Sequence, residues 1–380
     1  MRILLVNSHG GDGTYGGAER YVSALGNGLL ARGHDVEVLS AFPVQDGSGL
    51  GTHALHHADW RDSPVRRVRN HVGDVVAAPW PSLRAALETA APDLVHTNNL
   101  PGIATGIWET ARRLGLPTVH TLHDYQLLCP RTSLTRRDGT PCNPSPLLCG
   151  LRTRRLVRWA GGVRMVIAVS DYILRRHEGL FPTSEVCVVR PPLVPLHDRA
   201  PQRPSFPPKV LGYLGALTEV KGLKILLAVA PSLVERGLEL RIAGDGPLRA
   251  EVEACDDVRY AGRLDRSELA SFIAGCDVGM VPSLWDEPGP LVVGEWLSSG
   301  RPVLATRRGG LVEAAHRGGV VLFDESAPAL LGAVERLDDE EVWRDLEASL
   351  PEVHGAEDIE RWLDEHEAAY EVAREVPTPA

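Results

Sequence analysis

The sequence of 380 residues predicts two doubly wound α/β domains, each built on a parallel β-sheet. The chain is too long for one ordinary core. Short apolar stretches alternate with amphipathic ones. A proline-dense segment, residues 191–209, interrupts this alternation near the middle and is typical of a linker. We therefore expect an N-terminal domain over residues 1–195, a C-terminal domain over 205–355, and a helix over 356–380 that can return to the first domain.

Short apolar stretches rich in β-branched residues predict the strands of the first domain. Longer amphipathic patterns between them, such as residues 18–33 and 102–115, predict helices. Strands that alternate with helices are typical of βαβ units and of parallel pairing. The expected strands are residues 2–8, 35–41, 93–98, 117–123, 165–170 and 186–192.

The same alternation restarts after the proline-dense segment. Helical patterns at residues 222–237 and 266–276 separate apolar stretches, and the tail from about Asp339 is helical and acidic. The expected strands of the second domain are residues 209–217, 239–246, 258–264, 278–283, 301–307 and 319–324.

Charge and hydropathy indicate which kinds of partner, such as nucleic acid or a membrane, the protein can bind. The formal net charge of −10 argues against general nucleic-acid binding. No apolar run reaches the ~20 residues that span a bilayer, so we expect a cytoplasmic protein. Arginines concentrate in residues 152–164. This segment is either a solvated face or a contact with an anionic membrane surface or a phosphorylated acceptor, which would place the protein peripherally at the inner face of the membrane.

A glycine-rich stretch follows the first predicted strand. Gly11, Gly13 and Gly16 have the G-x-G-x-x-G spacing of a dinucleotide-binding turn. That fingerprint also needs an acidic residue at the end of the second strand, where this chain has the sequence Ser-Ala-Phe at 40–42. An oxidoreductase is therefore disfavoured. Gly16 and Gly17 are either a flexible turn or a helix start whose amides approach a phosphate.

The segment DEPGPLVVGE, residues 286–295, carries two glutamates on either side of a loop and a helix start. Pro290 suits a first helical position, and the free amides of that first turn favour an anion. Glu287 and Glu295 could bind the two ends of one ligand. Alternatively, they are helix glutamates that only stabilise the dipole.

GGAER at residues 16–20 and the E-x7-E pattern at 287–295 resemble GT-B glycosyltransferases of family 4. These enzymes transfer sugars from nucleotide donors with retention of configuration. The resemblance implies two Rossmann-like domains that face a central cleft, with the donor on the second and the acceptor on the first. It implies that Glu287 contacts the transferred sugar and that Glu295 holds the ribose. The implied phosphate-binding positions are Gly16, Gly17, Gly289, Pro290, Leu291 and Val292.

A second motif, LGALTEVKGLK at 214–224, is similar to the family pattern G-R-L-x-x-x-K-G. The resemblance implies that Lys221 neutralises the leaving diphosphate. Ala216 stands where the family usually has an arginine, so another cation must compensate. Arg263 is our expected donor-binding arginine, and the alternatives are Arg307 and Arg308.

His123 follows a predicted strand at the edge where ligands of open α/β sheets bind. A lone histidine is usually structural, but the family has a similar histidine whose ring touches the transferred sugar. We therefore expect a catalytic, sugar-positioning role for His123. His96 and His120 are weaker candidates.

These expectations describe a retaining, metal-independent hexosyltransferase with no cofactor, since the nucleotide-sugar is its substrate. Its acceptor is a small molecule or a glycan, and its arginine-rich, lysine-poor composition is typical of a high-GC, actinobacterial source. Two alternatives stay open: a nucleotide-sugar 2-epimerase, and a non-catalytic nucleotide-sugar-binding partner protein. The sugar, the nucleotide, the oligomeric state and the role of Cys129, Cys142 and Cys149 also stay open.

Overall fold

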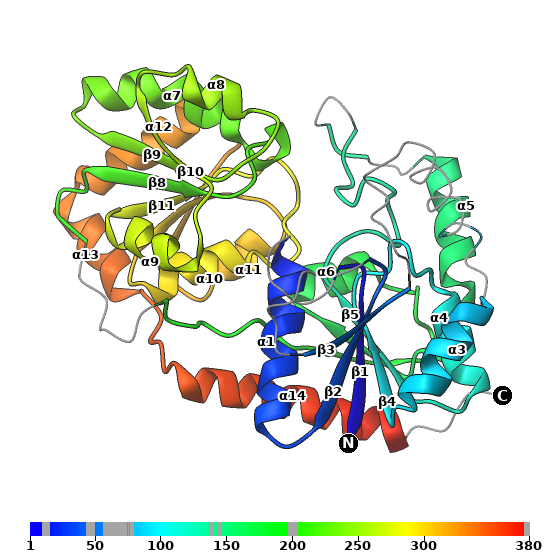
Figure 1. Cartoon of the computed structure of the whole chain (residues 1–380). Helices are drawn as coiled ribbons and strands as arrows, with labels where there is room; N and C mark the ends of the chain where they lie inside the picture. The colour runs from blue at the N-terminus through cyan, green and yellow to red at the C-terminus, as the bar shows by residue number, and fades with distance from the viewer. Residues whose placement is uncertain are drawn as a thin grey trace. The chain divides into compact units, whose positions relative to one another are not determined.

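The structure is a computed structural model that describes residues 1–9, 16–42, 50–55, 74, 76, 80–136, 140–142, 146–196 and 204–375. Gly11 and Gly13 of the glycine-rich stretch lie outside these residues. Contacts divide the chain into two compact units (Figure 1). The first unit contains Met1–Leu134, Cys142–Arg190 and Arg361–Ala380, and the second contains Thr135–Pro141 and Pro191–Glu360.

The first unit is a parallel sheet in the order β3-β2-β1-β4-β5-β6-β7 over its described residues. The order reverses between β1 and β4, as in a doubly wound fold. The strands are β1 Arg2–Asn7, β2 Asp35–Ser40, β3 Gly51–Ala54, β4 Leu94–Thr97, β5 Thr118–Leu122, β6 Met165–Ala168 and β7 Glu185–Val188. The helices are α1 Gly17–Ala31, α3 Pro81–Ala90, α4 Gly106–Arg113, α5 Leu147–Leu156, α6 Asp171–Arg176 and α14 Ala356–Glu375.

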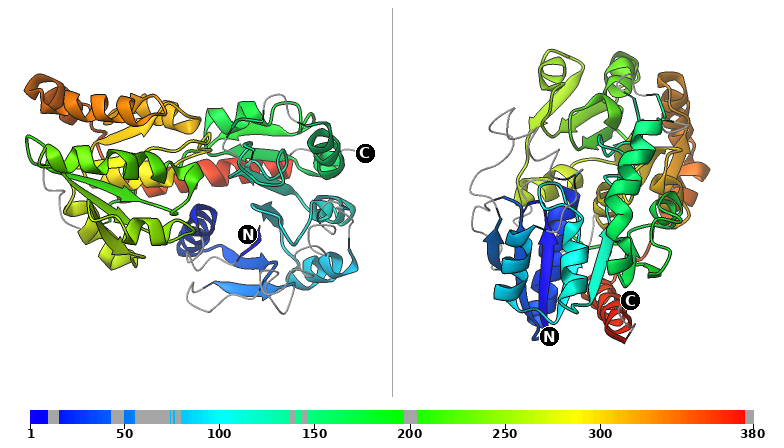
Figure 2. Two further views of the ribbon diagram at one scale, coloured as in Figure 1. Left: turned by 90° about the horizontal axis from the view of Figure 1, so that it is seen from above. Right: turned by 90° about the vertical axis from the view of Figure 1, so that its right-hand side faces the viewer.

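The C-terminal helix α14, red in Figure 2, is held in the first unit by polar contacts from Arg361 onward. His366 Nε2 lies 2.6 Å from the hydroxyl of Tyr21 on α1, and the Tyr370 hydroxyl lies 2.7 Å from His96 Nδ1 on β4. Arg32 at the end of α1 pairs with Asp364 at 2.8 Å. The first unit is therefore completed by a helix that lies far from it in the sequence. Among the described residues, no helix is both long and apolar enough to cross a bilayer.

The second unit is a parallel sheet in the order β10-β9-β8-β11-β12-β13. Side chains of successive strand residues enter two separate cores, so helices cover both faces of the sheet. The strands are β8 Val210–Leu214, β9 Glu239–Ala243, β10 Val258–Gly262, β11 Val278–Val281, β12 Val303–Thr306 and β13 Val320–Phe323. The helices are α7 Leu223–Glu235, α8 Arg249–Glu253, α9 Arg266–Ala274, α10 Leu291–Ser298, α11 Gly310–Ala315, α12 Ala327–Glu335 and α13 Glu340–Ala348. The predicted fold class is confirmed.

A buried tryptophan anchors α10 against this sheet. Trp296 is fully buried, and it packs against Gly212 of β8 and Gly279 of β11. A Cβ atom at either glycine would lie 2.5 Å from the indole ring. The two glycines therefore make room for the tryptophan, which anchors α10 on this face of the sheet.

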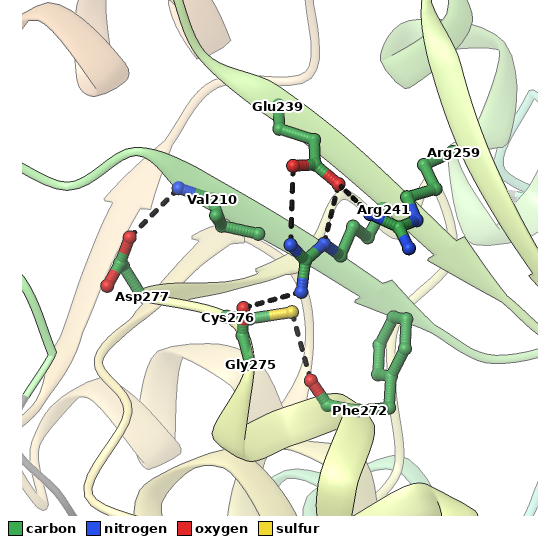
Figure 3. Close-up of polar contacts among 8 residues, drawn as sticks. All are labelled: Val210, Glu239, Arg241, Arg259, Phe272, Gly275, Cys276 and Asp277. Carbon is green, nitrogen blue, oxygen red and sulfur yellow. Dashed lines mark hydrogen bonds and ion pairs between the residues drawn. The ribbon is translucent and has the colours of Figure 1, made fainter.

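Polar contacts tie the amino ends of the strands together (Figure 3). The carboxylate of Asp277, just before β11, accepts hydrogen bonds from the amides of Ser205, Lys209 and Val210 at 2.8–2.9 Å. Within β9, Arg241 pairs with Glu239 at 2.7 Å, and Glu239 also lies 3.5 Å from Arg259 of β10. Part of the predicted linker is thus built into the second unit, because a buried carboxylate binds its backbone.

Candidate active site

The strand order of the second unit reverses between β8 and β11, and ligands of open α/β sheets bind at such a reversal. The loops that leave the carboxyl ends of these two strands meet there. The amide of Leu284, after β11, donates to the carbonyl of Val220, after β8, at 2.8 Å. Topology therefore brings together two motifs that are about 60 residues apart in the sequence.

Lys221 and Glu287 form the centre of this meeting point. Lys221 Nζ lies 2.8 Å from Glu287 Oε1, and the Ser283 hydroxyl donates to the same oxygen at 2.5 Å. The Glu287 side chain is 6% exposed and that of Lys221 is 29% exposed. The ammonium group also lies 4.8 Å from the centre of the Trp285 ring. A nearly buried carboxylate is tolerated here because it is paired and hydrogen-bonded.

The segment after β12 holds the backbone of Glu287 in place. The amide of Gly310 donates to the Glu287 carbonyl at 2.6 Å. Gly309 has φ +52°, and a Cβ atom there would lie 2.6 Å from that carbonyl oxygen. Thr306 donates to the carbonyl of Ser283 at 2.6 Å. The loop that carries Glu287 is therefore fixed before any ligand binds, as an efficient binding site requires.

The amino end of α10 follows directly after this loop. Pro290 precedes the helix, so the expectation that it occupies the first helical position is wrong by one residue, because the helix starts at Leu291. Pro290, the N-cap residue, makes no side-chain cap hydrogen bond, and the amides of a first helical turn favour an anion. Leu291, Val292 and Glu295 are half-buried along the helix. Among the described residues, no three His, Cys, Asp or Glu side chains lie together as ligands for a metal ion.

Of the three arginines considered in place of the one missing at Ala216, Arg308 lies beside the Glu287 loop. Its Nη1 is 3.6 Å from Asp286 Oδ1, and it pairs with Glu325. Arg307 is exposed and lies 3.7 Å from Asp324. Arg263 follows β10, two strands away from β8, so its donor-binding role stays a prediction.

Replacing Gly222 by alanine is expected to destabilise the second unit and to weaken ligand binding. Gly222 has φ +75°, and a Cβ atom would lie 1.8 Å from the Pro282 carbonyl oxygen. Gly237→Ala is the matched control, because Gly237 has φ +74° with nothing within 4 Å of an added Cβ. The control should cost about 1–2 kcal/mol in strain, and Gly222→Ala about 1–3 kcal/mol more, measured by urea unfolding. If the two variants lose the same free energy of unfolding, the loops after β8 and β11 are not tightly packed against each other.

In the first unit, His123 lies at the carboxyl edge of the sheet, directly after β5. Its Nε2 is 2.8 Å from Oδ1 of Asn98, which follows β4, and the Tyr21 ring contacts it edge-on with centroids 4.6 Å apart. Burial, together with the nearby His366, lowers the pKa of His123 to about 3, so the ring is neutral at pH 7. Asn98 was not singled out from the sequence, although a polar residue just after a strand was a usable signal.

The two weaker histidine candidates are buried in the structure. His96 contacts Thr121 Oγ1 at 2.6 Å, and His120 contacts Thr97 Oγ1 at 3.0 Å. Burial lowers the pKa of both rings. Both therefore serve the packing of the first unit.

Gly16 and Gly17 lie at the start of α1, as expected for a helix-start phosphate site. However, Glu19 is 6% exposed, and a Cβ atom on Gly16 would lie 3.0 Å from its Oε2. A carboxylate thus lies at this amino end, where it favours the helix dipole. Phosphate binding by these two glycines stays a prediction.

Comparisons with known proteins agree with this architecture. A family model described as Glycosyltransferase Family 4 matches residues 15–198, and one described as Glycosyl transferases group 1 matches residues 208–339. The chain is 26% identical to glycogen synthase of Mycobacterium tuberculosis, over 90% of this chain and 86% of that one. It is 26% identical to D-inositol 3-phosphate glycosyltransferase of Arthrobacter, over 88% and 84%.

Two solved structures share the fold. Sucrose-phosphate synthase from Thermosynechococcus elongatus matches with a TM-score of 0.66 and 19% identity, over 98% of this chain and 97% of that one. Anabaena HepE, in complex with UDP and glucose, matches with a TM-score of 0.68 and 16% identity, over 98% and 99%. The chain is a GT-B glycosyltransferase, with a family 4 N-terminal domain and a group 1 C-terminal domain.

Proposed function

We propose that this glycosyltransferase moves a hexosyl group from a nucleotide-sugar to an acceptor hydroxyl with retention of configuration and without a metal ion. The Lys221–Glu287 pair, beside the start of α10, carries this proposal. The pair places a cation and a carboxylate at the strand-order reversal of the second unit. The similarity to a glycogen synthase and a mannosyltransferase, and to HepE bound to UDP and glucose, supports a nucleotide-sugar donor.

Charge development explains the proposed roles. As the bond between the sugar C1 and the diphosphate breaks, negative charge grows on the leaving oxygen. Lys221 and the first-turn amides of α10 would stabilise that charge without reorganising. The acceptor hydroxyl bonds to C1 on the face that the diphosphate leaves, and its proton passes to the leaving phosphate oxygen.

The remaining roles are implied by the resemblance to family 4. Glu287 and His123 would orient the transferred sugar, and Glu295 would hold the ribose. The neutral His123 ring can exchange hydrogen bonds with sugar hydroxyls, because its pKa lies well below 7.

A panel of UDP-, ADP- and GDP-sugars tests the donor site. The matching donor should stabilise the protein by about 2.7 kcal/mol at 100 times its Kd, seen as a rise in Tm, and should undergo slow hydrolysis. NMR of the transfer product should show the donor's anomeric configuration, and EDTA should leave the rate unchanged.

Each outcome tests a separate part of the proposal. If no nucleotide-sugar raises the Tm, the donor-site assignment is wrong. An inverted product excludes retention, and loss of activity in EDTA excludes metal independence. An isomerised nucleotide-sugar formed from the donor alone would indicate an epimerase.

A further inference from the structure

The helix α5 presents leucines to solvent on its outer face. Leu147, Leu148 and Leu151 are 80%, 78% and 51% exposed. Single exposed apolar residues are ordinary, but adjacent ones on a helix turn indicate a contact surface. Burying an exposed leucine side chain would contribute about 1.5–3 kcal/mol of favourable free energy. Figures 1 and 2 show α5 at the margin of the first unit.

The inner face of the same helix is firmly attached. The Thr153 hydroxyl donates to the Leu127 carbonyl at 2.9 Å, and Thr105 donates to the Leu156 carbonyl at 2.7 Å. Thr153 and Leu156 are buried. The exposed leucines therefore belong to a fixed helix with a defined outer face.

Arginines follow the leucines on this outer face. Arg154, Arg155 and Arg158 are exposed. At 1.5 Å rise per residue, Arg154 lies about 10 Å along the axis from Leu147. Spacings of four and three residues put positions 147, 151 and 154 on one side of α5, and Arg158 follows in the 3-10 helix Val157–Gly162. We call Leu147, Leu148, Leu151, Arg154 and Arg155 the α5 outer face.

The sequence around this face is rich in arginine. No acidic residue stands between Asp138 and Asp171, although the whole chain has a net charge of −10. Arg158, which follows α5, donates to the Val76 carbonyl at 2.7 Å. Two other arginines of the segment turn inward: Arg152 donates to the Gln126 carbonyl at 2.7 Å, and Arg164 is 8% exposed.

We propose that the α5 outer face docks on a lipid bilayer that carries anionic headgroups. The leucines would enter the boundary between headgroups and acyl chains, and the arginines would contact lipid phosphates. Charge complementarity favours this occupant, because an apolar end next to a basic end matches the layers of an anionic membrane surface. The face lies outside the candidate active site, so this inference does not depend on the proposed function.

Vesicle flotation with the full chain tests the proposal. The protein should float with vesicles of phosphatidylcholine and 30% phosphatidylglycerol, and much less with pure phosphatidylcholine. Raising the salt concentration should weaken binding, because surface charges are screened. Arg154→Gln with Arg155→Gln should lower the partition coefficient about 25-fold, since each basic residue contributes about 1 kcal/mol, or about fivefold.

Leu147→Glu with Leu148→Glu should lower partitioning at least tenfold with an unchanged Tm. Glutamates in the first turn suit the dipole of α5, so folding should not suffer. Val234→Glu is the matched control, because Val234 is 48% exposed on α7 of the second unit. It should bind anionic vesicles like the unmodified chain.

Three results would overturn the proposal. One is the absence of flotation with anionic vesicles, and another is flotation that neither α5 variant changes. The third is self-association of the unmodified chain, measured by sedimentation velocity, that the leucine variant abolishes; a second copy of the chain would then be the occupant of this face.

Discussion

Lys221→Ala is expected to lower kcat by about 100- to 1000-fold, the range seen when one preorganised group that stabilises developing negative charge is removed. The ammonium group lies 2.8 Å from Glu287 at the strand-order reversal. The resemblance to family 4 implies a second cation at the position of Ala216, so we expect the loss toward the upper end of this range. The measurement is steady-state transfer with the donor that the thermal-shift panel identifies.

The variant also leaves the buried Glu287 carboxylate without its cation, which is expected to cost about 3 kcal/mol of stability. A second substitution separates this effect from catalysis. Glu287→Gln added to Lys221→Ala removes the unpaired charge, so the double variant should recover Tm but not kcat. Lys224→Ala is the matched control, since Lys224 is 54% exposed and pairs with the exposed Glu219. A folded Lys221→Ala enzyme with more than half the original kcat would contradict the assigned role.

Strand prediction succeeded where burial is continuous. The stretches at residues 2–8 and 117–123 are apolar because strands of a parallel sheet are covered on both faces, and both contain observed strands. β3, Gly51–Ala54, was not predicted, since its residues are largely exposed and polar. Edge strands of this kind carry no apolar signal, and only the pairing with β2 reveals them.

The candidate site was predictable as two motifs but not as one site. Glycines, prolines and charged residues at helix starts are local signals, and they identified Lys221 and Glu287 separately. Their ion pair spans 66 residues of sequence, and only the strand order brings them together. Ser283 gave no signal of its own, because a serine after a strand is common, yet it donates to the same carboxylate oxygen.

The proline-dense segment shows the opposite limitation. Composition predicts a linker over residues 191–209, and the described parts of it, 191–196 and 204–209, contain no helix or strand; composition does not show which parts are bound. Leu193 is 6% exposed, and Ser205 and Lys209 donate to Asp277. Ser205 and Lys209 are bound because of a single buried acid, Asp277, which lies about 70 residues later in the chain.

Asp277→Asn is expected to destabilise the second unit by about 3 kcal/mol. Both oxygens of Asp277 are used: Oδ1 accepts from the amide and hydroxyl of Ser205, and Oδ2 accepts from the amides of Lys209 and Val210. An asparagine must point its NH2 group at one of these pairs, so at least one buried amide loses its acceptor. Asp265→Asn is the matched control, because Asp265 is an exposed N-cap where asparagine serves equally well.

The same contacts predict a pH dependence. Burial alone would raise the pKa of Asp277, but the hydrogen bonds from Ser205 and the backbone outweigh it and lower the pKa. The carboxylate therefore stabilises the folded state at pH values above the unfolded pKa of about 3.9. That contribution is lost as pH falls below this value toward the lower folded pKa. Urea unfolding and hydrogen exchange of the β8 amides measure the difference in free energy of unfolding between the original chain and Asp277→Asn. This difference should be full at pH 6 and should become smaller below about pH 4. If the difference in free energy of unfolding stays constant down to pH 2.5, the charge of Asp277 does not hold β8 to β11.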